Sequence, residues 1–409
     1  MFYFPFEFTF LRGINTKHMM FFFGAICLLL DMLLVKKISF SKELLISSFI
    51  AIVFSLVGFY STDYNVTSDY AYAAYIGSMW IWLLACYGAC TSIRLTHGYI
   101  SVKLIVNYLL IICVLQCIVA LLIDFVPSVK SVVDAIFVTG DLRFMEKVKR
   151  LYGIGASLDV AGVRFSAVLV MAAVILSKDR ILRSNTVHMT SYIFAFMIIG
   201  VMGNMLARTT SIGLLLGIAY IVFKSGLFSL FVRLVNFKLW KTLIASLAVF
   251  ISIAVYLYKT SKQAFLLIRF AFEGFFNWVE QGEWETDSTE VLKEMWVFPS
   301  STKTWVIGDG LFNNPWTGGF YMNTDVGYLR FIYYCGLIGL FFFSIFFIYL
   351  SYSLSRRFHY VRDIFLLLLI IVFANWIKVA TDIFLVYAFF LVISQPYFAN
   401  YYKKDFEAL

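Results

Sequence analysis

Long runs of apolar residues recur along the whole chain, and short polar segments separate them. A helix needs roughly 20 apolar residues to cross the hydrocarbon core of a bilayer, and most of the runs approach that length. The runs are continuous and do not alternate apolar with polar positions, which disfavours a membrane β-barrel. The pattern therefore predicts an all-α polytopic membrane protein with a single integral-membrane domain over residues 1–409. About eleven transmembrane helices are expected, over residues 18–35, 43–60, 70–92, 104–125, 161–177, 189–206, 209–223, 241–258, 326–350, 363–378 and 382–396.

The composition agrees with a membrane protein and excludes other classes. Hydrophobic residues make up 62% of the chain and charged residues 14%, with a mean hydropathy of +0.86. These values exclude a soluble globular protein. All six cysteines lie in apolar runs, so neither a disulfide framework nor a set of metal ligands in a polar loop is visible. We predict no metal and no cofactor.

Basic residues are concentrated in every second short connection. Residues 36–42, 178–183 and 356–362 are examples. Since Lys and Arg in short loops favour the cytoplasmic side, this alternation orients the chain. It also accounts for the net charge of +9 without nucleic acid as a partner. Two long loops, 126–160 and 259–325, then lie on the opposite, outer side.

Charged residues in the second long loop recur at helical spacing. Lys262, Arg269, Glu273 and Glu280 are separated by seven, four and seven positions, with aromatic and aliphatic residues between them. This spacing predicts an amphipathic helix that either lies on the outer membrane face or covers the helix bundle. A second helix over 287–297 is expected to begin with a capping box formed by its first four residues.

Three arginines on the outer side depart from the general distribution of charge. Arg208 lies in a short turn between two apolar runs, Arg164 begins a run, and Arg330 lies about one turn inside another. Each costs a few kcal/mol unless an anion or water is its partner. Snorkelling to lipid headgroups and structural ion pairs are the alternatives. Three together favour an anionic ligand, and the planar guanidinium suits the oxygens of phosphate or diphosphate.

The outer loops also carry aromatic and acidic residues that suit a sugar substrate. Trp305, Trp316 and Tyr321 lie in or beside the glycine-rich stretch 308–319, and aromatic faces stack on the C–H faces of sugars. An interfacial aromatic belt is the alternative. Asp159 either pairs with the nearby arginine or lines the site. None of the four histidines falls in a long outer loop, so proton transfer there would need a carboxylate.

Three motifs connect these charges to the apolar runs. Residues 150–166 contain Arg150, paired glycines and the sequence DVAGVRFS, residues 208–217 read RTTSIGLLLG, and residues 308–339 run from GDG through DVGYLR to GLIG. Together the motifs resemble those of the bacterial O-antigen polymerases of the Wzy type and, more distantly, the O-antigen ligases of the same superfamily. The resemblance covers roughly residues 150–340, with the first apolar runs contributing nothing specific.

This resemblance implies a glycosyltransferase in the bacterial inner membrane, with its active site facing the periplasm. Such an enzyme polymerises lipid-linked oligosaccharide repeat units into O-antigen for lipopolysaccharide, or into a capsular or related surface polysaccharide. The growing glycan would leave undecaprenyl diphosphate and join the non-reducing end of an incoming undecaprenyl-diphosphate-linked unit. The transfer would invert the anomeric centre without a metal ion. The implied partners are the lipid-linked oligosaccharide, membrane lipid, a chain-length regulator and a flippase.

The resemblance also implies roles for individual residues. Arg208 and Arg164 would bind the diphosphate, with Arg208 acting in catalysis, and Arg150 and Arg330 are further candidates for the same anion. Asp325 occupies the place of a histidine in the ligases, which favours a polymerase and makes Asp325 the candidate base. Glycan contacts are assigned to aromatic residues and a carboxylate of the outer loops: Trp305, Trp316, Tyr321 and Asp159.

Two other functions remain compatible with the sequence. A ligase would use the same donor but transfer the glycan to lipid A–core. A flippase or secondary transporter, which is a different class of protein, would also carry charges within its membrane helices. However, no inverted repeat and no matching pair of broken helices is apparent in the sequence, and the loop 259–325 is long for a carrier.

Overall fold

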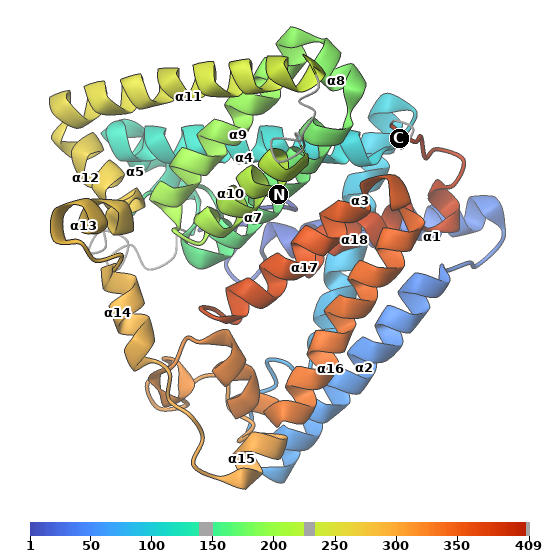
Figure 1. Cartoon of the computed structure of the whole chain (residues 1–409). Helices are drawn as coiled ribbons and strands as arrows, with labels where there is room; N and C mark the ends of the chain where they lie inside the picture. The colour runs from blue at the N-terminus through green and yellow to red at the C-terminus, as the bar shows by residue number, and fades with distance from the viewer. Residues whose placement is uncertain (139–149, 225–233, 406–409) are drawn as a thin grey trace. The chain divides into compact units, whose positions relative to one another are not determined.

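The structure is a computed structural model that describes residues 1–409 with the exception of 139–149, 225–233 and 406–409 (Figure 1). The described residues form helices, connecting segments and isolated β-bridges, and no strand occurs among them. The chain divides into two compact units. The first unit comprises Met1–Thr16, Ser101–Glu285 and Lys404–Leu409, and the second comprises Lys17–Ile100 and Thr286–Lys403.

Within the described ranges, nine helices are long and apolar enough to cross a membrane, which confirms an all-helical, multi-pass membrane protein. The apolar helices α10 (Thr210–Lys224) and α18 (Phe384–Ile393) have 15 and 10 residues, shorter than the ~20 residues of a full crossing. The number of eleven crossings therefore stays a prediction. The nine long helices are α1 (Thr16–Val35), α2 (Lys42–Tyr64), α3 (Tyr75–His97), α4 (Val102–Phe125), α7 (Leu158–Lys178), α9 (Thr186–Leu206), α11 (Leu234–Thr260), α16 (Gly327–Arg357) and η2 with α17 (His359–Val361 and Arg362–Trp376).

Helix α7 forms the centre of the first unit. Nearly all of its side chains are buried, against α4, α9 and α10, and α7 and α10 lie side by side (Figure 1). A helix that is apolar all round is expected to be enclosed by other helices. The contact with α10 requires a glycine, because a Cβ on Gly213 would lie 2.2 Å from the Cα of Ser166. The unit also contains the short helices α5 (Pro127–Ile136) and α8 (Arg180–Ser184).

The segment after α11 differs from the single amphipathic helix that the sequence predicts. It forms two helices, α12 (Lys262–Ala271) and α13 (Glu273–Gln281), because Phe272 between them leaves the helical conformation with φ −118° and ψ 27°. The joint changes the direction of the chain, so the charged residues do not follow one continuous helix face. The prediction of helical, amphipathic structure here is confirmed, and the prediction of one helix is wrong.

The capping box of the next helix lies one residue earlier than predicted. Thr286, not Asp287, precedes α14 (Asp287–Glu294) in an extended conformation and exchanges hydrogen bonds with Thr289. The Thr289 amide donates to the Thr286 hydroxyl over 3.2 Å, and the Thr286 amide donates to the Thr289 hydroxyl over 2.8 Å. Two threonines thus replace the predicted acidic pair, because a hydroxyl can both accept and donate. The helix ends at Glu294, before the predicted residue 297.

Aromatic rings fill the core of the second unit between α2, α16 and α17. The ring of Phe343 stacks on Phe54 with centroids 4.5 Å apart and on Trp376 with centroids 5.2 Å apart. Helices α2 and α16 run side by side along much of their length (Figure 1). The remaining elements of this unit are short: α15 (Thr302–Ile307), η1 (Tyr321–Asn323) and η3 (Pro396–Phe398).

Helix α16 is broken at Gly336, and the loop that follows α15 fills the break. Gly336 has φ 66° and ψ −173°, a conformation that essentially only glycine adopts. The amides of Asp309 and Gly310 donate to the carbonyls of Tyr333 and Tyr334 over 2.6 and 3.1 Å. The hydroxyl of Ser61, on α2, donates to the second of these carbonyls over 2.7 Å. The break therefore leaves neither carbonyl without a donor.

Replacing Gly336 by alanine is expected to lower the free energy of unfolding by about 1–3 kcal/mol from backbone strain alone. A Cβ at this position would also lie 2.1 Å from the carbonyl oxygen of Val306. Thermal unfolding of the purified protein in detergent measures the effect. Gly77→Ala on α3 is the matched control, since its new Cβ meets no atom within 4 Å. Equal stability of the two variants would contradict a structural requirement for glycine in the break.

Candidate functional site

Two arginines of the first unit converge on one aromatic ring. The guanidinium of Arg208, in the turn between α9 and α10, lies 4.2 Å from the centroid of the Phe270 ring, and that of Arg150 lies 5.1 Å from the same centroid. Arg208 donates from Nε to the Phe270 carbonyl over 3.1 Å and pairs through Nη2 with Glu273. The Nε of Arg150 is buried and has no hydrogen-bond partner among the described residues. Two cations thus surround one ring, with one carboxylate in direct contact.

Hydrogen bonds between α7 and α10 fix the turn that carries Arg208. The hydroxyl of Thr209 donates to Asp159 over 3.1 Å. Ser166 donates from its hydroxyl to the Thr209 carbonyl over 2.8 Å and accepts from the Gly213 amide over 3.1 Å. These contacts join residues of the motifs 150–166 and 208–217, so the two motifs form one packing arrangement. No feature of the sequence indicated that Thr209 and Ser166 would connect them.

Arg164 lies in the same unit but faces another ring. Its side chain is buried, and its guanidinium lies 5.8 Å from the centroid of the Phe4 ring. Its backbone carbonyl accepts a 2.8 Å hydrogen bond from the hydroxyl of Tyr3. The N-terminal segment is therefore packed against the start of α7. The structure brings Arg150 and Arg208 together on Phe270 and places Arg164 beside Phe4.

In the second unit, Arg330 holds the loop between α15 and α16 in place. Its guanidinium lies 3.5 Å from the centroid of Phe312 and 4.4 Å from that of Phe320. Nη1 donates to Asp325 over 3.2 Å, and Nη2 donates to the Phe312 carbonyl and to the side chain of Asn313, each over 3.1 Å. Arg330 is only 6% exposed. This geometry favours a structural role for the pair of Arg330 and Asp325.

The three aromatic residues expected to bind glycan have different surroundings. Trp305 stacks on Phe298 with an interplanar angle of 15° and donates from its indole to the Pro299 carbonyl over 2.8 Å. Trp316 is 87% exposed. Tyr321 donates from its hydroxyl to Asp309 over 3.4 Å. Only Trp316 therefore presents most of its ring to the surroundings.

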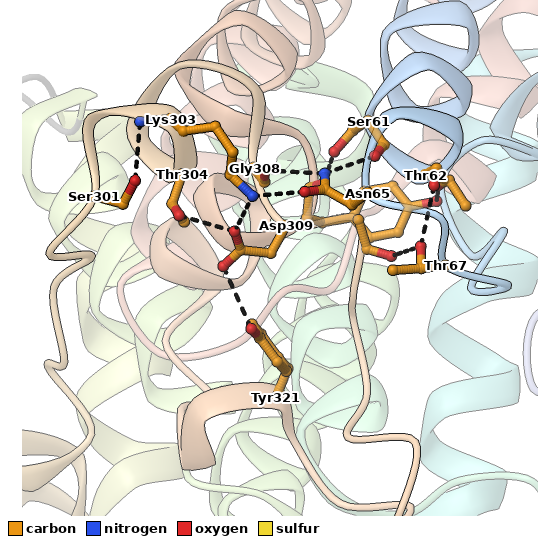
Figure 2. A network of polar contacts seen from close by, with 12 residues as sticks. Ser61, Thr62, Asn65, Thr67, Ser301, Lys303, Thr304, Gly308, Asp309 and Tyr321 are labelled. Carbon is orange, nitrogen blue, oxygen red and sulfur yellow. Dashed lines mark hydrogen bonds and ion pairs between the residues drawn. The ribbon is translucent and has the colours of Figure 1, made fainter.

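A polar network surrounds Asp309, the central residue of the sequence GDG. Figure 2 shows Lys303 in contact with both Asp309 and Asn65, over 2.7 and 2.5 Å, and Thr304 donating to the same carboxylate over 2.8 Å. Burial and the neighbouring carboxylate raise the pKa of Tyr321, so its hydroxyl keeps the proton that it donates. Sequence reasoning did not select Lys303 or Asn65; the aspartate between the two glycines was the one available signal.

The first unit also contains an apolar cavity of about 420 Å³. Residues of α9, α10 and α11 line it, and Phe272, from the joint of α12 and α13, contributes as well. Phe272 lies between Phe270 and Glu273, the two residues that contact Arg208. One residue of the cavity lining is therefore a close neighbour in the chain of two residues that contact Arg208.

The predicted site residues fall into both units. Arg150, Asp159, Arg164 and Arg208 belong to the first, whereas Asp325, Arg330 and the three aromatic residues belong to the second. The structure shows local contacts within each group. In the described part of the chain, no group of three or more His, Cys, Asp or Glu side chains could hold a metal ion.

Comparison of the chain with protein-family models, with curated proteins and with solved structures finds no match. The class of protein is accordingly defined by the fold itself. The chain is a multi-pass α-helical membrane protein, and its first unit holds a pair of arginines on one ring and an apolar cavity.

Replacing Arg330 by alanine is expected to lower the free energy of unfolding by on the order of 2–3 kcal/mol, because Asp325, the Phe312 carbonyl and Asn313 would each lose a hydrogen bond from the guanidinium. Limited proteolysis should cleave residues 311–324 faster in the variant than in the unaltered protein. Arg330→Lys keeps the charge but loses the planar fork, so its stability should be intermediate. Unaltered stability in Arg330→Ala would show that Arg330 is not a structural clamp and would favour a ligand.

Proposed function

We propose that this protein is a glycosyltransferase that polymerises oligosaccharide repeat units carried on undecaprenyl diphosphate. The observation that carries the proposal is the convergence of Arg150 and Arg208 on the ring of Phe270. The three sequence motifs supply the particular reaction class, through their resemblance to O-antigen polymerases. The product would be O-antigen or a related surface polysaccharide, made on the periplasmic face of the inner membrane.

The charges around Phe270 support a diphosphate as the ligand. Arg150 and Arg208 carry two positive charges and Glu273 carries one negative charge, so this group has one positive charge in excess. The buried Nε of Arg150 still has a hydrogen to donate. Guanidinium groups recognise phosphate oxygens with two parallel hydrogen bonds. Fixed cations also stabilise a leaving diphosphate where charge develops in the transition state.

The apolar cavity supports a lipid carrier for that diphosphate. Its volume is about 420 Å³. One water molecule takes up about 30 Å³ in the liquid, so the cavity has room for roughly 14 groups of that size, such as methylene or methyl groups. A few isoprene units of a polyprenyl chain would fill this space. Phe272 lines the cavity next to residues that contact Arg208, so one ligand with an apolar tail and an anionic head would satisfy both features.

In the proposed reaction, the acceptor hydroxyl attacks the anomeric carbon of the donor glycan. The new bond joins the acceptor oxygen to that carbon, and the bond from the carbon to the diphosphate oxygen breaks with its electron pair. The proton of the hydroxyl passes to a carboxylate. The sequence predicts Asp325 as the base, with Asp159 as the alternative. Of the two, Asp159 belongs to the same unit as the arginine pair, and it is the base that we propose for this site. The base role of Asp325 and the glycan contacts at Trp305, Trp316 and Tyr321 concern the second unit and stay predictions from the sequence.

One observation bears on a secondary transporter as the second candidate. Broken membrane helices form ion and substrate sites in transporters, and α16 is broken at Gly336. The amides of Asp309 and Gly310 and the hydroxyl of Ser61 already occupy the carbonyls at this break. A break that the protein satisfies internally favours a structural role. A ligase would share the diphosphate site and differ in its acceptor, lipid A–core.

Arg208→Ala is expected to slow polymer formation by about 10²–10³-fold, because it removes a fixed cation from the leaving group. The assay reconstitutes the protein with a defined undecaprenyl-diphosphate-linked repeat unit and follows the product ladder without nucleotide sugar or metal. Arg180→Ala is the matched control, since Arg180 is an exposed arginine of the first unit that has no part in the proposed site. Normal long polymer from Arg208→Ala would refute the diphosphate role.

The unaltered protein distinguishes the alternatives in the same assay. Transfer to lipid A–core alone would identify a ligase, and movement of the lipid across the bilayer without transfer would identify a flippase.

Ala254→Phe tests whether the cavity holds the carrier lipid. Ala254 lines the cavity on α11, so the larger ring should raise the KM for the lipid-linked unit roughly tenfold, equivalent to ~1.4 kcal/mol of lost binding. The control is Ala248→Phe, at an exposed position of the same helix outside the cavity lining. Equal KM values in the two variants would place the lipid chain elsewhere.

A further inference from the structure

Helix α13 presents an apolar face that the first unit leaves uncovered. Phe275, Trp278 and Val279 occupy positions i, i+3 and i+4 of this helix and are 49%, 53% and 62% exposed. Trp284, just beyond the helix, is 69% exposed. The rings of Trp278 and Trp284 lie 6.3 Å apart, and those of Phe275 and Trp278 lie 6.4 Å apart. These four side chains form a continuous patch, which we name the aromatic patch.

The aromatic patch is attached to the end of a membrane helix. Only Ser261 separates α11 from α12, and few residues of the α11 span are buried. Tyr258, in the last turn of α11, contacts Phe265 of α12 at 4.7 Å and Phe276 of α13 at 5.8 Å. The two short helices are therefore held where α11 ends, and the exposed apolar surface of α11 is followed directly by theirs.

The positive and negative charges of the segment 259–285 nearly cancel, so its exposed aromatic rings are its distinctive feature. Residues 259–285 contain three basic and four acidic side chains. Arg269 and Glu280 bridge α12 and α13 through two hydrogen bonds of 2.7 and 2.6 Å. Hydrogen bonds from Arg269 hold the pKa of Glu280 below its ordinary value, so the bridge persists near neutral pH. Electrostatic attraction to an anionic partner is therefore not the basis of binding.

We infer that α12, α13 and the aromatic patch lie in the headgroup region of the bilayer, with Phe275, Trp278 and Trp284 inserted among the lipids. Tryptophan and other aromatic residues favour this region because one part of the ring is apolar and another is polar. Amphipathic helices that lie in the membrane plane bury such a face at the boundary of headgroups and acyl chains. The partner is thus the lipid surface itself, and zwitterionic lipid is sufficient. The inference does not depend on the proposed enzymatic function.

This placement fixes the depth of the arginine pair. Phe270 and Glu273 flank the joint between α12 and α13, and both contact Arg208. A membrane-bound α13 would thus hold Arg208 level with the phosphate groups of lipids. Phe272, at the joint itself, would lie at the end of the apolar cavity nearest the headgroups.

Tryptophan fluorescence in nanodiscs tests the inference on the full chain. Nanodiscs are prepared from phosphatidylcholine brominated near the glycerol end or near the terminus of the acyl chain, and bromine quenches nearby tryptophan. The emission of Trp278 and Trp284 is obtained as the difference between the unaltered protein and the variant W278F/W284F. We expect this difference to be quenched mostly by the shallow bromine. Added phosphatidylglycerol or raised salt should leave the quenching unchanged.

Trp316→Phe provides the control, since Trp316 is also exposed but lies outside this segment. This variant should retain the quenching that W278F/W284F loses. Quenching of Trp278 and Trp284 by aqueous iodide, without quenching by bromine, would show that water covers the aromatic patch and would overturn the inference. Protection from both quenchers would overturn it as well, in favour of a second copy of the chain as the partner.

Discussion

The carbonyl groups of Tyr333 and Tyr334 set the constraint on which the second unit depends. They lose their helical partners where α16 breaks, and a hydrocarbon environment offers no water in exchange. The amides of Asp309 and Gly310 replace those partners. The loop and α16 approach each other so closely here that glycine is needed at Gly336. The backbone conformation of Gly336 is also one that other residues rarely adopt. A loop that looks like a wet, ligand-binding stretch in the sequence is thus part of the framework of its unit.

Arg330 and Arg208 differ in the groups that surround their guanidiniums. Arg330 has a carboxylate, a carbonyl and an amide oxygen around its guanidinium and aromatic rings against it, which describes a clamp. Arg208 also has a carboxylate, that of Glu273, and a carbonyl, that of Phe270, but it shares the ring of Phe270 with a second guanidinium, that of Arg150. Two like charges on one ring repel each other, so an anion that contacts both would relieve an unfavourable interaction. This difference is the reason that the proposed diphosphate site belongs to the first unit.

The segment from α11 to α13 links the arginine pair to the surface that we infer lies in the bilayer. Helix α11 is largely uncovered, α12 and α13 follow it directly, and their joint contributes both to the apolar cavity and to the contacts of Arg208. Lipid would therefore act as a structural partner of the segment, in place of the protein core that a soluble protein would supply. The balance of acidic and basic residues in 259–285 is consistent with binding through apolar surface.

The sequence by itself determined the helical, membrane-spanning class and the approximate positions of the helices, because long apolar runs admit few other structures. It also identified the unusual arginines, since charge next to an apolar run is costly. It could not determine that Phe272 would interrupt an amphipathic helix or that α16 would break at Gly336. Nor could it show that Arg330 would be held by Asp325, Phe312 and Asn313, whereas Arg208 would share a ring with Arg150. Only the tertiary structure decided these points, because they depend on which distant side chains and carbonyls pack against each residue.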